Sequence, residues 1–301
     1  MEKKLDSIFY KKLYKDVKEN PEEHWKNIGI KEERIPNEEI YNNLIKQKYA
    51  LKLVKINLMR EHCENKKTRF DIHENSYYFN LNNINKIDRN KLVISSIIDL
   101  TYYNNYEDYE LNVKNKTKKK HNPLSSMNTS INRGYYCKKF EYENYINDIY
   151  DINTSKKIRC GREMNNSYMQ DIRNANLNKL IDDKKIDNNF HYQIMFGIFK
   201  HIDGYKQGQI ITNEKLVGYI SFIRCGNLVL YSRILGHGDY LIDNIMYQLH
   251  FYIIKEWIYN KNNKPGEQIN YVLYGGHYDG VQDKLKSWKE KLLFEPINLC
   301  V

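Results

Sequence analysis

The sequence has no long apolar run, no paired cysteines and no arginine-rich segment. No stretch reaches the ~18 apolar residues that a membrane-spanning helix needs, and the first residues lack the apolar core of a secretory signal. The five cysteines are widely spaced with no CxxC pair, so neither a zinc knuckle nor a dithiol redox motif is indicated. We therefore expect a soluble cytoplasmic protein with reduced thiols, no membrane association and no bound metal.

The composition is that of a folded protein with a basic surface. Of its 301 residues, 41% are hydrophobic and 29% are charged, and the formal net charge is +10. A basic surface favours polyanions, among them nucleic acids, coenzyme A and nucleotide-sugars. Because no RNP-like motif accompanies the lysines, nucleic acid is not expected as a general partner.

The chain divides into three regions, residues 1–60, 61–131 and 132–301. The first is predicted to be a helical module, because apolar residues recur at three- and four-residue steps. Pro21 is placed to begin one of its helices, and Asn37 is placed to cap another. The second region is irregular except for one apolar run, and the third alternates strands and helices in an orderly way.

The predicted elements indicate an α+β fold. In the second region, the apolar run Leu92–Leu100 predicts a buried strand. In the third region the predicted strands are Tyr135–Phe140, Gln193–Lys200, Leu216–Arg224, Leu228–Leu235, Ile269–Tyr274 and Phe294–Leu299. The predicted helices are Tyr145–Ile152, Ser167–Leu180, Asn244–Tyr259 and Val281–Leu292. Gly226 and Asn227 form a hairpin turn between two of the strands. We expect a mixed, mostly antiparallel sheet flanked by helices.

A phosphate-binding pattern follows one of these strands. Arg233-Ile-Leu-Gly-His-Gly238 precedes a predicted helix, whose first N–H groups and dipole favour a pyrophosphate. The string matches Arg/Gln-x-x-Gly-x-Gly/Ala, and both it and the order of elements resemble the GNAT superfamily of N-acyltransferases. The resemblance implies acetyl-CoA as a co-substrate. In this register the residues expected to contact acetyl-CoA are Arg233, Ile234, Leu235, Gly236 and Gly238.

A second register of the same site is open. A helix beginning at Gly236 would run to about Tyr259, which is longer than usual in the superfamily. A cradle at Tyr240–Met246 leaves a helix of ordinary length, and we slightly prefer it, although Asn244 and Met246 then replace small residues. Its cofactor contacts are Leu241, Ile242, Asp243, Asn244, Ile245 and Met246. A plain strand-to-helix turn is the structural alternative.

The closing segment resembles the superfamily pattern aromatic-Lys-x-x-Gly-Phe-x-Pro. Trp288 stands near the aromatic position and Leu293 replaces the glycine. Many members carry a Tyr there that protonates the departing thiolate, which an indole cannot do. The candidates for acid or base are therefore Tyr274, His277, Tyr278 and His237, and for each a structural role is the alternative.

Two further features concern the acceptor and the sheet. The segment Asp148–Arg162 resembles the first-helix region of polysaccharide-linked relatives, which implies that Arg159 and Arg162 contact a substrate phosphate; ordinary surface arginines are the alternative. The superfamily usually closes with two strands, but only one fits before Val301. The missing strand comes either from residues 61–131 or from a second copy in a homodimer.

Three functions compete. The segment from Phe9 to Arg34 resembles a helical module often attached to enzymes of glycan synthesis, which implies acetyl transfer to a primary amine of an amino-sugar or nucleotide-amino-sugar. The order Asp108-Tyr109, a Lys-rich tract and Arg133-Gly-Tyr-Tyr136 resembles FemX-like transferases that use aminoacyl-tRNA, and this alternative also explains the charge of +10. The departures at Asn244, Met246, Trp288 and Leu293 motivate a third alternative, a non-catalytic GNAT-like binding module.

Overall fold

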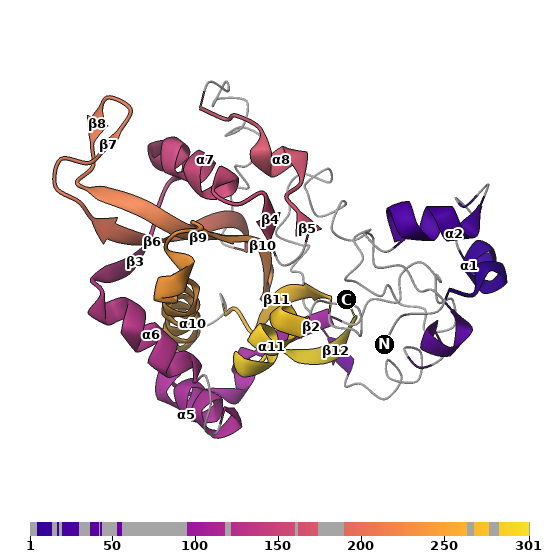
Figure 1. The fold of residues 1–301 in the computed structure, drawn as a ribbon. Helices are drawn as coiled ribbons and strands as arrows, with labels where there is room; N and C mark the ends of the chain where they lie inside the picture. Colours follow the sequence, from indigo (N-terminus) through magenta and orange to yellow (C-terminus); the bar gives the residue numbers. More distant parts are fainter. Residues whose placement is uncertain are drawn as a thin grey trace.

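In the computed structural model, a mixed sheet lies at the centre and helices cover both of its faces (Figure 1). The described residues are 5–13, 17, 20–29, 37–41, 43, 53–55, 95–117, 122–159, 162–173, 190–263, 268–276 and 283–300.

The sheet has eight strands in the described part of the chain. From edge to edge they are β1 (Leu53–Lys55), β12 (Glu295–Cys300), β2 (Ser95–Asp99), β11 (Tyr271–Gly276), β10 (Leu228–Gly236), β9 (Glu214–Cys225), β6 (His191–His201) and β3 (Tyr135–Lys139). The β1–β12 and β10–β11 pairs are parallel, and the other pairs are antiparallel. The predicted α+β class with a mostly antiparallel sheet is confirmed.

The two faces of the sheet carry different helices. One face, which we call the α10 face, packs against α5 (Tyr106–Lys116), α6 (Pro123–Asn132), α10 (Ile245–Asn263) and α11 (Asp283–Lys291). The other, the α7 face, packs against α7 (Ile146–Thr154) and α8 (Asn166–Met169). Apolar residues from both the strands and the helices fill the space between, because each element buries its apolar side against the sheet.

Strand β2 lies between β11 and β12 and is antiparallel to both. It confirms the buried strand predicted within Leu92–Leu100, over Ser95–Asp99. Ser95 and Ser96 are buried with Ile97 and Ile98, as expected for a strand covered on both faces. The position beside the closing strand is therefore filled from the same chain, which is one of the two sources left open by the sequence.

Most elements predicted in residues 132–301 are confirmed with their ends shifted by one or two residues. The turn between β9 and β10 is the predicted one, with Cys225 paired to Leu228 and Gly226 at φ 60°. The helix predicted over Ser167–Leu180 is wrong in extent, because α8 ends at Met169 and residues 170–173 are not helical. Residues 174–180 lie outside the described residues. Helix α10 extends four residues past the predicted end, to Asn263.

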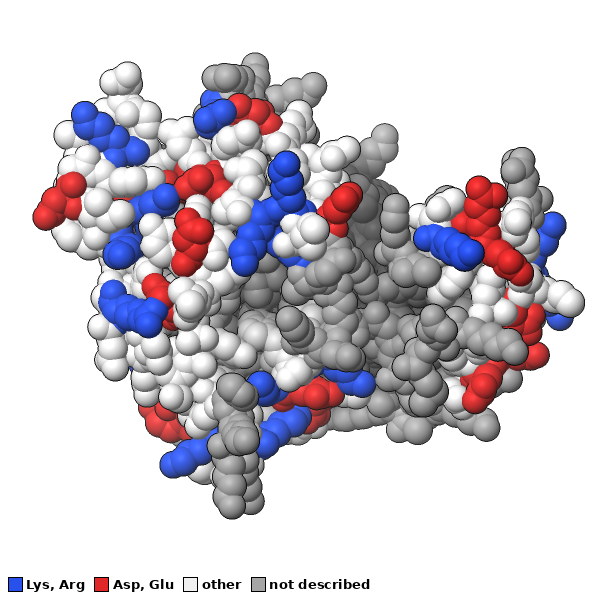
Figure 2. Space-filling view, viewed as in Figure 1, with Lys and Arg blue, Asp and Glu red and all other residues white. Residues whose placement is uncertain are grey.

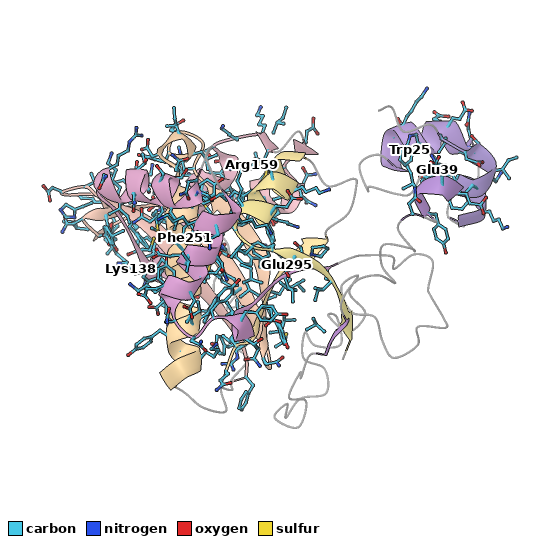
Figure 3. All side chains as sticks on the ribbon, turned by 90° about the horizontal axis from the view of Figure 1, so that it is seen from below. Trp25, Glu39, Lys138, Arg159, Phe251 and Glu295 are labelled. Carbon is cyan, nitrogen blue, oxygen red and sulfur yellow. The ribbon has the colours of Figure 1, made fainter. Side chains whose placement is uncertain are left out.

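The N-terminal helices form a small group of their own. They are α1 (Ser7–Leu13) and α2 (Pro21–His24), which continues into a π-helical turn, η1 (Trp25–Gly29). Pro21 begins α2 as predicted, and the Asn20 side chain caps it by accepting from the Glu22 N–H. The ring of Tyr10 contacts that of Trp25. Figures 1 and 3 show this group, with Trp25, set apart from the sheet.

Candidate functional site

Strands β10 and β11 are paired over a short stretch and then part. Leu228–Leu230 pair in parallel with Tyr271–Leu273, after which β10 continues to Gly236 beside β9. In the described part of the chain, no strand pairs with the other edge of β10 beyond Leu230. The opening leaves backbone N–H and C=O groups along one edge of β10 available to a ligand. We call this opening the gap.

A bulge at Ser232 sends its neighbours to opposite faces. In a regular strand, residues i and i+2 share a face, but the register of β10 shifts between Tyr231 and Arg233. Tyr231 therefore packs in the apolar cluster of the α10 face. Arg233 pairs with Ser221 and contacts Tyr168, which packs on the α7 face. Tyr231 and Arg233 thus flank the gap from its two sides.

A buried lysine lies on the α10 side of the gap. Lys289 of α11 is 2% exposed, and its Nζ is 4.6 Å from the ring centroid of Tyr274. Tyr274 is the first residue of β11 past the paired stretch, and its ring centroid is 5.0 Å from that of Tyr231. Burial lowers the pKa of Lys289 to about 8, because apolar surroundings disfavour the charged ammonium. Such a group exchanges a proton close to neutral pH.

The structure corrects the alignment of the closing helix. Leu293 has φ 64°, the left-handed conformation that glycine usually supplies, so it does stand at the glycine of the superfamily pattern. The aromatic of that pattern lies four residues before the glycine, which is Lys289 and not Trp288. A helical periodicity would have revealed Lys289, because Leu285, Leu292 and Leu293 share its side of the helix.

A chain of buried hydrogen bonds holds Tyr231 in place. The Tyr109 hydroxyl donates to the Leu292 carbonyl at 2.8 Å, so its oxygen accepts from His250 Nε2 at 3.0 Å. His250 Nδ1 then accepts from the Tyr231 hydroxyl at 2.7 Å. Burial lowers the pKa of His250 to about 3, so the ring is neutral, as this direction of bonds requires. The bonds tie α5 and α10 to the strand that borders the gap.

The start of α10 presents unpaired backbone N–H groups. A 3-10 turn, η5 (Leu241–Asp243), leads through Asn244 at φ 61° into the helix, which begins at Ile245. No hydrogen bond joins the N–H groups of Leu241, Ile242, Ile245 or Met246 to another described residue. N–H groups at the positive end of a helix bind anions. Because α10 begins at Ile245, the alternative prediction that this helix begins at Gly236 is wrong.

The glycines of the Arg233–Gly238 string serve packing. A Cβ on Gly236 would lie 2.9 Å from Met246 Sδ, and one on its strand partner Gly218 would lie 3.1 Å from the same atom. The two glycines thus make room for Met246, where the superfamily has a small residue. The Gly238 N–H donates to Ser155 Oγ at 2.9 Å, so it is engaged within the fold.

Asp243 is the acidic residue at this helix start, and its charge is compensated. Its carboxylate pairs with Arg133 and accepts from the Tyr135 hydroxyl. A carboxylate paired with a guanidinium opposes a bound anion less than an unpaired one does. The unpaired N–H groups, together with this compensation, fit a pyrophosphate.

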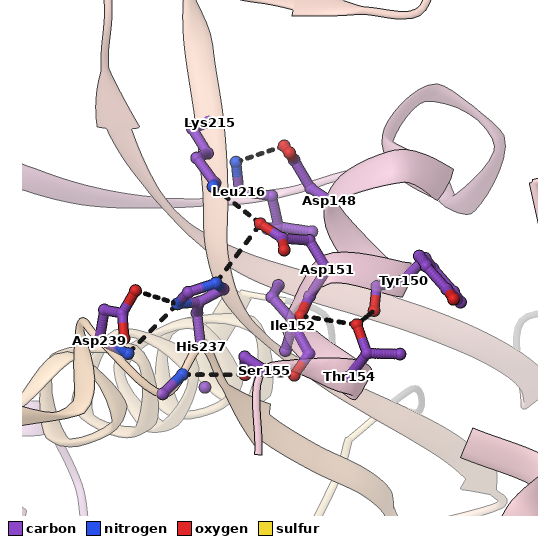
Figure 4. A network of polar contacts seen from close by, with 12 residues as sticks. Asp148, Tyr150, Asp151, Ile152, Thr154, Ser155, Lys215, Leu216, His237 and Asp239 are labelled. Carbon is purple, nitrogen blue, oxygen red and sulfur yellow. Dashed lines mark hydrogen bonds and ion pairs between the residues drawn. The ribbon is translucent and has the colours of Figure 1, made fainter. Parts of the chain in front are cut away.

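His237 lies at the far end of β10, in a polar network on the α7 face (Figure 4). Its Nδ1 accepts from the Asp239 backbone N–H at 3.2 Å, and its Nε2 is 3.4 Å from Asp151 Oδ2. Lys215 Nζ is 2.8 Å from the same oxygen. Six positions along an extended chain, from Tyr231 to His237, span roughly 15–20 Å. His237 and Tyr274, which is level with Tyr231, therefore cannot act on the same reacting atom.

Arg159 is engaged within the fold. Its Nη1 donates to the Gly236 carbonyl at 2.8 Å, and its Nη2 donates to the Ile152 carbonyl at 2.7 Å and to Ser155 Oγ at 3.0 Å. These bonds close the C-terminal end of α7 and tie it to the end of β10. Arg159 ends β4 (Ile158–Arg159), which pairs with β5 (Arg162–Glu163).

Three of the predicted site residues lie wholly or partly outside the described residues. The backbone of Arg162 is described but its side chain is not, and His277 and Tyr278 are outside altogether. Two other predicted residues on β10 face opposite sides of the sheet. Ile234 packs toward the α10 face and Leu235 is buried on the α7 face. The predicted cradle residues lie at the start of α10, one turn beyond the Arg233–Gly238 string.

The described strands and helices form an α+β fold whose mostly antiparallel sheet includes β2 from the preceding region. No family model and no curated protein matches the chain. It is similar to three solved structures, of which it spans 51% to 58% of the length. FemX shares 10% identity over 67% of this chain and 58% of FemX, with a TM-score of 0.43. A conserved protein of unknown function from Bacteroides thetaiotaomicron shares 12% identity over 68% of this chain and 57% of that protein, with a TM-score of 0.39. A tandem GNAT protein from the clavulanic acid biosynthesis pathway shares 13% identity over 68% of this chain and 51% of that protein, with a TM-score of 0.36.

The described residues hold neither a membrane-spanning helix nor a cluster of metal ligands. None of their helices combines the length and apolar character required to cross a bilayer. No group of three or more His, Cys, Asp or Glu side chains among them is placed to hold a metal ion.

Proposed function

We propose that the chain is an N-acyltransferase that moves an acyl group, most simply acetyl, from an acyl-CoA to a primary amine. The observation that carries the proposal is the gap between β10 and β11. Near one end it has the N–H groups of Leu241, Ile242, Ile245 and Met246, which bond to no described residue, and at the other end it has Lys289 with Tyr274. A ligand with a pyrophosphate at one end and a reactive acyl group at the other suits such an arrangement.

Each end of the gap would have its own role. Coenzyme A would supply the acyl group as a thioester, which an amine can attack. The N–H groups of Leu241, Ile242, Ile245 and Met246 would hold its pyrophosphate. Lys289, with a pKa of about 8, holds a proton on Nζ at neutral pH and can donate it at the gap. Lys289→Met would then lower kcat about 10²-fold while leaving coenzyme A binding intact.

The acceptor we propose is an amino-sugar, free or nucleotide-linked. The resemblance of the N-terminal residues to a module of glycan-synthesis enzymes supports it. Tyr142 and Tyr168 on the α7 face are partly exposed, and their rings suit contact with a sugar.

The pyrophosphate site is tested through the exposed side chain of Ile242. It is 80% exposed, so Ile242→Glu and Ile242→Gln place a charged and a neutral side chain of similar size beside the cradle without disturbing the core. Calorimetry should show coenzyme A binding weakened about tenfold by Glu and little by Gln. Pantetheine, which lacks the pyrophosphate, should bind all three proteins alike. If the folded wild type binds neither acetyl-CoA nor coenzyme A, the proposal is wrong.

A second candidate donor is aminoacyl-tRNA, favoured by two observations. An acidic residue, Asp243, and a large one, Met246, occupy the start of α10 where coenzyme A would bind. Lys and Arg side chains also gather over the part of the surface where Figure 1 places α8 and β4 (Figure 2). Titration with bulk tRNA at several salt concentrations separates the two donors. Affinity that falls steeply with salt supports tRNA, and affinity that does not change argues against it.

A further inference from the structure

Arg233 carries a partly buried guanidinium. In the described part of the chain, no Asp or Glu oxygen lies within the 4.0 Å of an ion pair with it. Other arginines differ: Arg133 pairs with Asp243 and Arg173 pairs with Asp171. A guanidinium partly removed from water without a counter-ion favours an incoming anion, because the anion replaces the lost hydration.

Tyrosines fix the position of this guanidinium. The Cζ atom of Arg233 lies 4.9 Å from the ring centroid of Tyr168. The Tyr219 hydroxyl donates to Asn153 Oδ1 at 2.7 Å, so its oxygen is left to accept from Arg233. Burial raises the pKa of Tyr142, and the positive charge of Arg233 opposes that rise, which places Tyr142 on the same side. Apart from this contact with Tyr219, the guanidinium N–H groups bond to no described residue and can meet a ligand.

Arg233 lies where its backbone and its side chain can meet different ligands. The bulge at Ser232 turns the Arg233 side chain onto the α7 face while its backbone remains on the open edge of β10. Lys156 and Lys157 are exposed after α7 on the same face, and they add positive charge. The backbone of Arg233 can therefore meet the donor, as the superfamily string implies, while the side chain faces a second ligand.

We propose that Arg233, positioned by Tyr168 and Tyr219, binds an oxyanion carried by the acceptor, a carboxylate or a phosphate. The acceptor is then an anionic amine, whose amino group enters the gap beside Ser232. Arginine presents a planar fork that matches either oxyanion with two parallel hydrogen bonds. The position of the amino group rests on the proposed acyltransferase function, whereas the oxyanion site rests on the surroundings of Arg233.

Calorimetry with three matched amino-sugars tests the site without any acyl donor. The probes are glucosamine, glucosamine 6-phosphate and glucosaminuronic acid, which carry at the same carbon a hydroxyl, a phosphate and a carboxylate. The wild type should bind one or both anionic probes at least about tenfold more tightly than glucosamine. Arg233→Gln should remove that preference. The ratio between the two anionic probes then tells which oxyanion the site prefers.

The matched control is Arg173→Gln. Arg173 also stacks on a tyrosine, with its Cζ 4.2 Å from the Tyr150 ring centroid, but Asp171 already binds its Nε and Nη2. The preference for anionic probes should survive this change. Arg233→Lys keeps the charge without the planar fork and should retain part of the preference. Thermal unfolding shows whether each variant folds, and Arg233→Lys replaces Arg233→Gln in the test if the latter does not.

The proposal is overturned if the wild type shows no preference for either anionic probe, including no binding of any probe. It is also overturned if Arg233→Gln and Arg233→Lys, both folded, keep the full preference. Failure of the proposed function is a separate result. Anion preference that depends on Arg233, with no acyl transfer to any amine, would remove the acyltransferase and leave the site.

Discussion

The two faces of the sheet are built on different principles. The α10 face holds one large apolar cluster. The buried hydrogen bonds within it run from Tyr231 through His250 to Tyr109 and end on a backbone carbonyl. The α7 face holds a smaller cluster, and its network around Asp151 reaches solvent. The difference predicts that the α10 face carries most of the stability, whereas the proposed recognition of the acceptor uses the α7 face.

The gap between β10 and β11 is where these two faces meet. Lys289 approaches it from the α10 face, and Arg233 from the α7 face. Lys289 is a buried cation on its own face. An ionisable group kept in such a place at a cost in stability is typical of a functional site.

The largest expected effect is loss of stability on the α10 face. Phe251 of α10 is fully buried, and its ring contacts Tyr109 and His250. Phe251→Ala should lower the free energy of unfolding in urea by about 3–5 kcal/mol, through lost burial and the cavity left behind. Leu111→Ala, at a 55% exposed position of α5, should cost less than about 0.5 kcal/mol. Equal costs would contradict the assignment of stability to this face.

The second effect depends on pH and concerns Lys289. Its folded pKa is about 8 and its unfolded pKa is ~10.4, so between these pH values the unfolded chain binds more protons. The wild type should therefore gain stability as pH rises from about 8 to about 10, by up to ~1.4 kcal/mol per pKa unit, and show no such slope below 8. Lys289→Met removes the buried charge, so it should be more stable than wild type at pH 7.

That advantage of Lys289→Met should shrink as the pH approaches 10. Urea unfolding of both proteins at pH 7, 8, 9 and 10 measures it as a difference, in which other titrating groups largely cancel. A difference that stays constant across this range would show that the pKa of Lys289 is not lowered by its surroundings.

The third effect concerns the buried hydrogen bonds behind Tyr231. Tyr109→Phe leaves the His250 Nε2 hydrogen and the Leu292 carbonyl without their partner, which should cost about 1–3 kcal/mol in urea unfolding. Tyr252→Phe is the control on α10, because no described residue bonds to its hydroxyl. It should change stability by less than about 0.5 kcal/mol. Similar costs for both would mean that the chain of bonds contributes nothing specific.

The sequence predicted those parts of the fold that depend on local chemistry. The strands from β6 to β10 and the turn at Gly226 followed from apolar periodicity and from glycine at positive φ. The cap of α2 at Asn20 and its start at Pro21 obey equally local rules. Such features need no knowledge of what lies across the sheet.

The candidate site depended on pairing between distant segments, and here the sequence told less. Nothing in the string around Ser232 marks a bulge, so Arg233 could not be assigned to a face. The neighbours of β2 were likewise open, since its partners lie at the other end of the chain. Arg159 illustrates the same limit, because its acceptors on β10 and α7 are defined only by the fold. Lys289 differs, because a lysine on an apolar side of a helix is a signal that the sequence itself carries.

The smallest expected effect is the loss of stability when the exposed ion pairs of the α7 face are removed. Asp151 contacts both Lys215 and His237, yet its side chain is 47% exposed, so water screens both contacts. Asp151→Asn should therefore cost less than about 1 kcal/mol in urea unfolding, and less still at high salt. Asp203→Asn removes the partner of His201 at a 96% exposed position and should produce no measurable change. A cost for Asp151→Asn as large as that of Phe251→Ala would mean that the α7 network holds the fold together, and that its polar side chains are not spare for recognition.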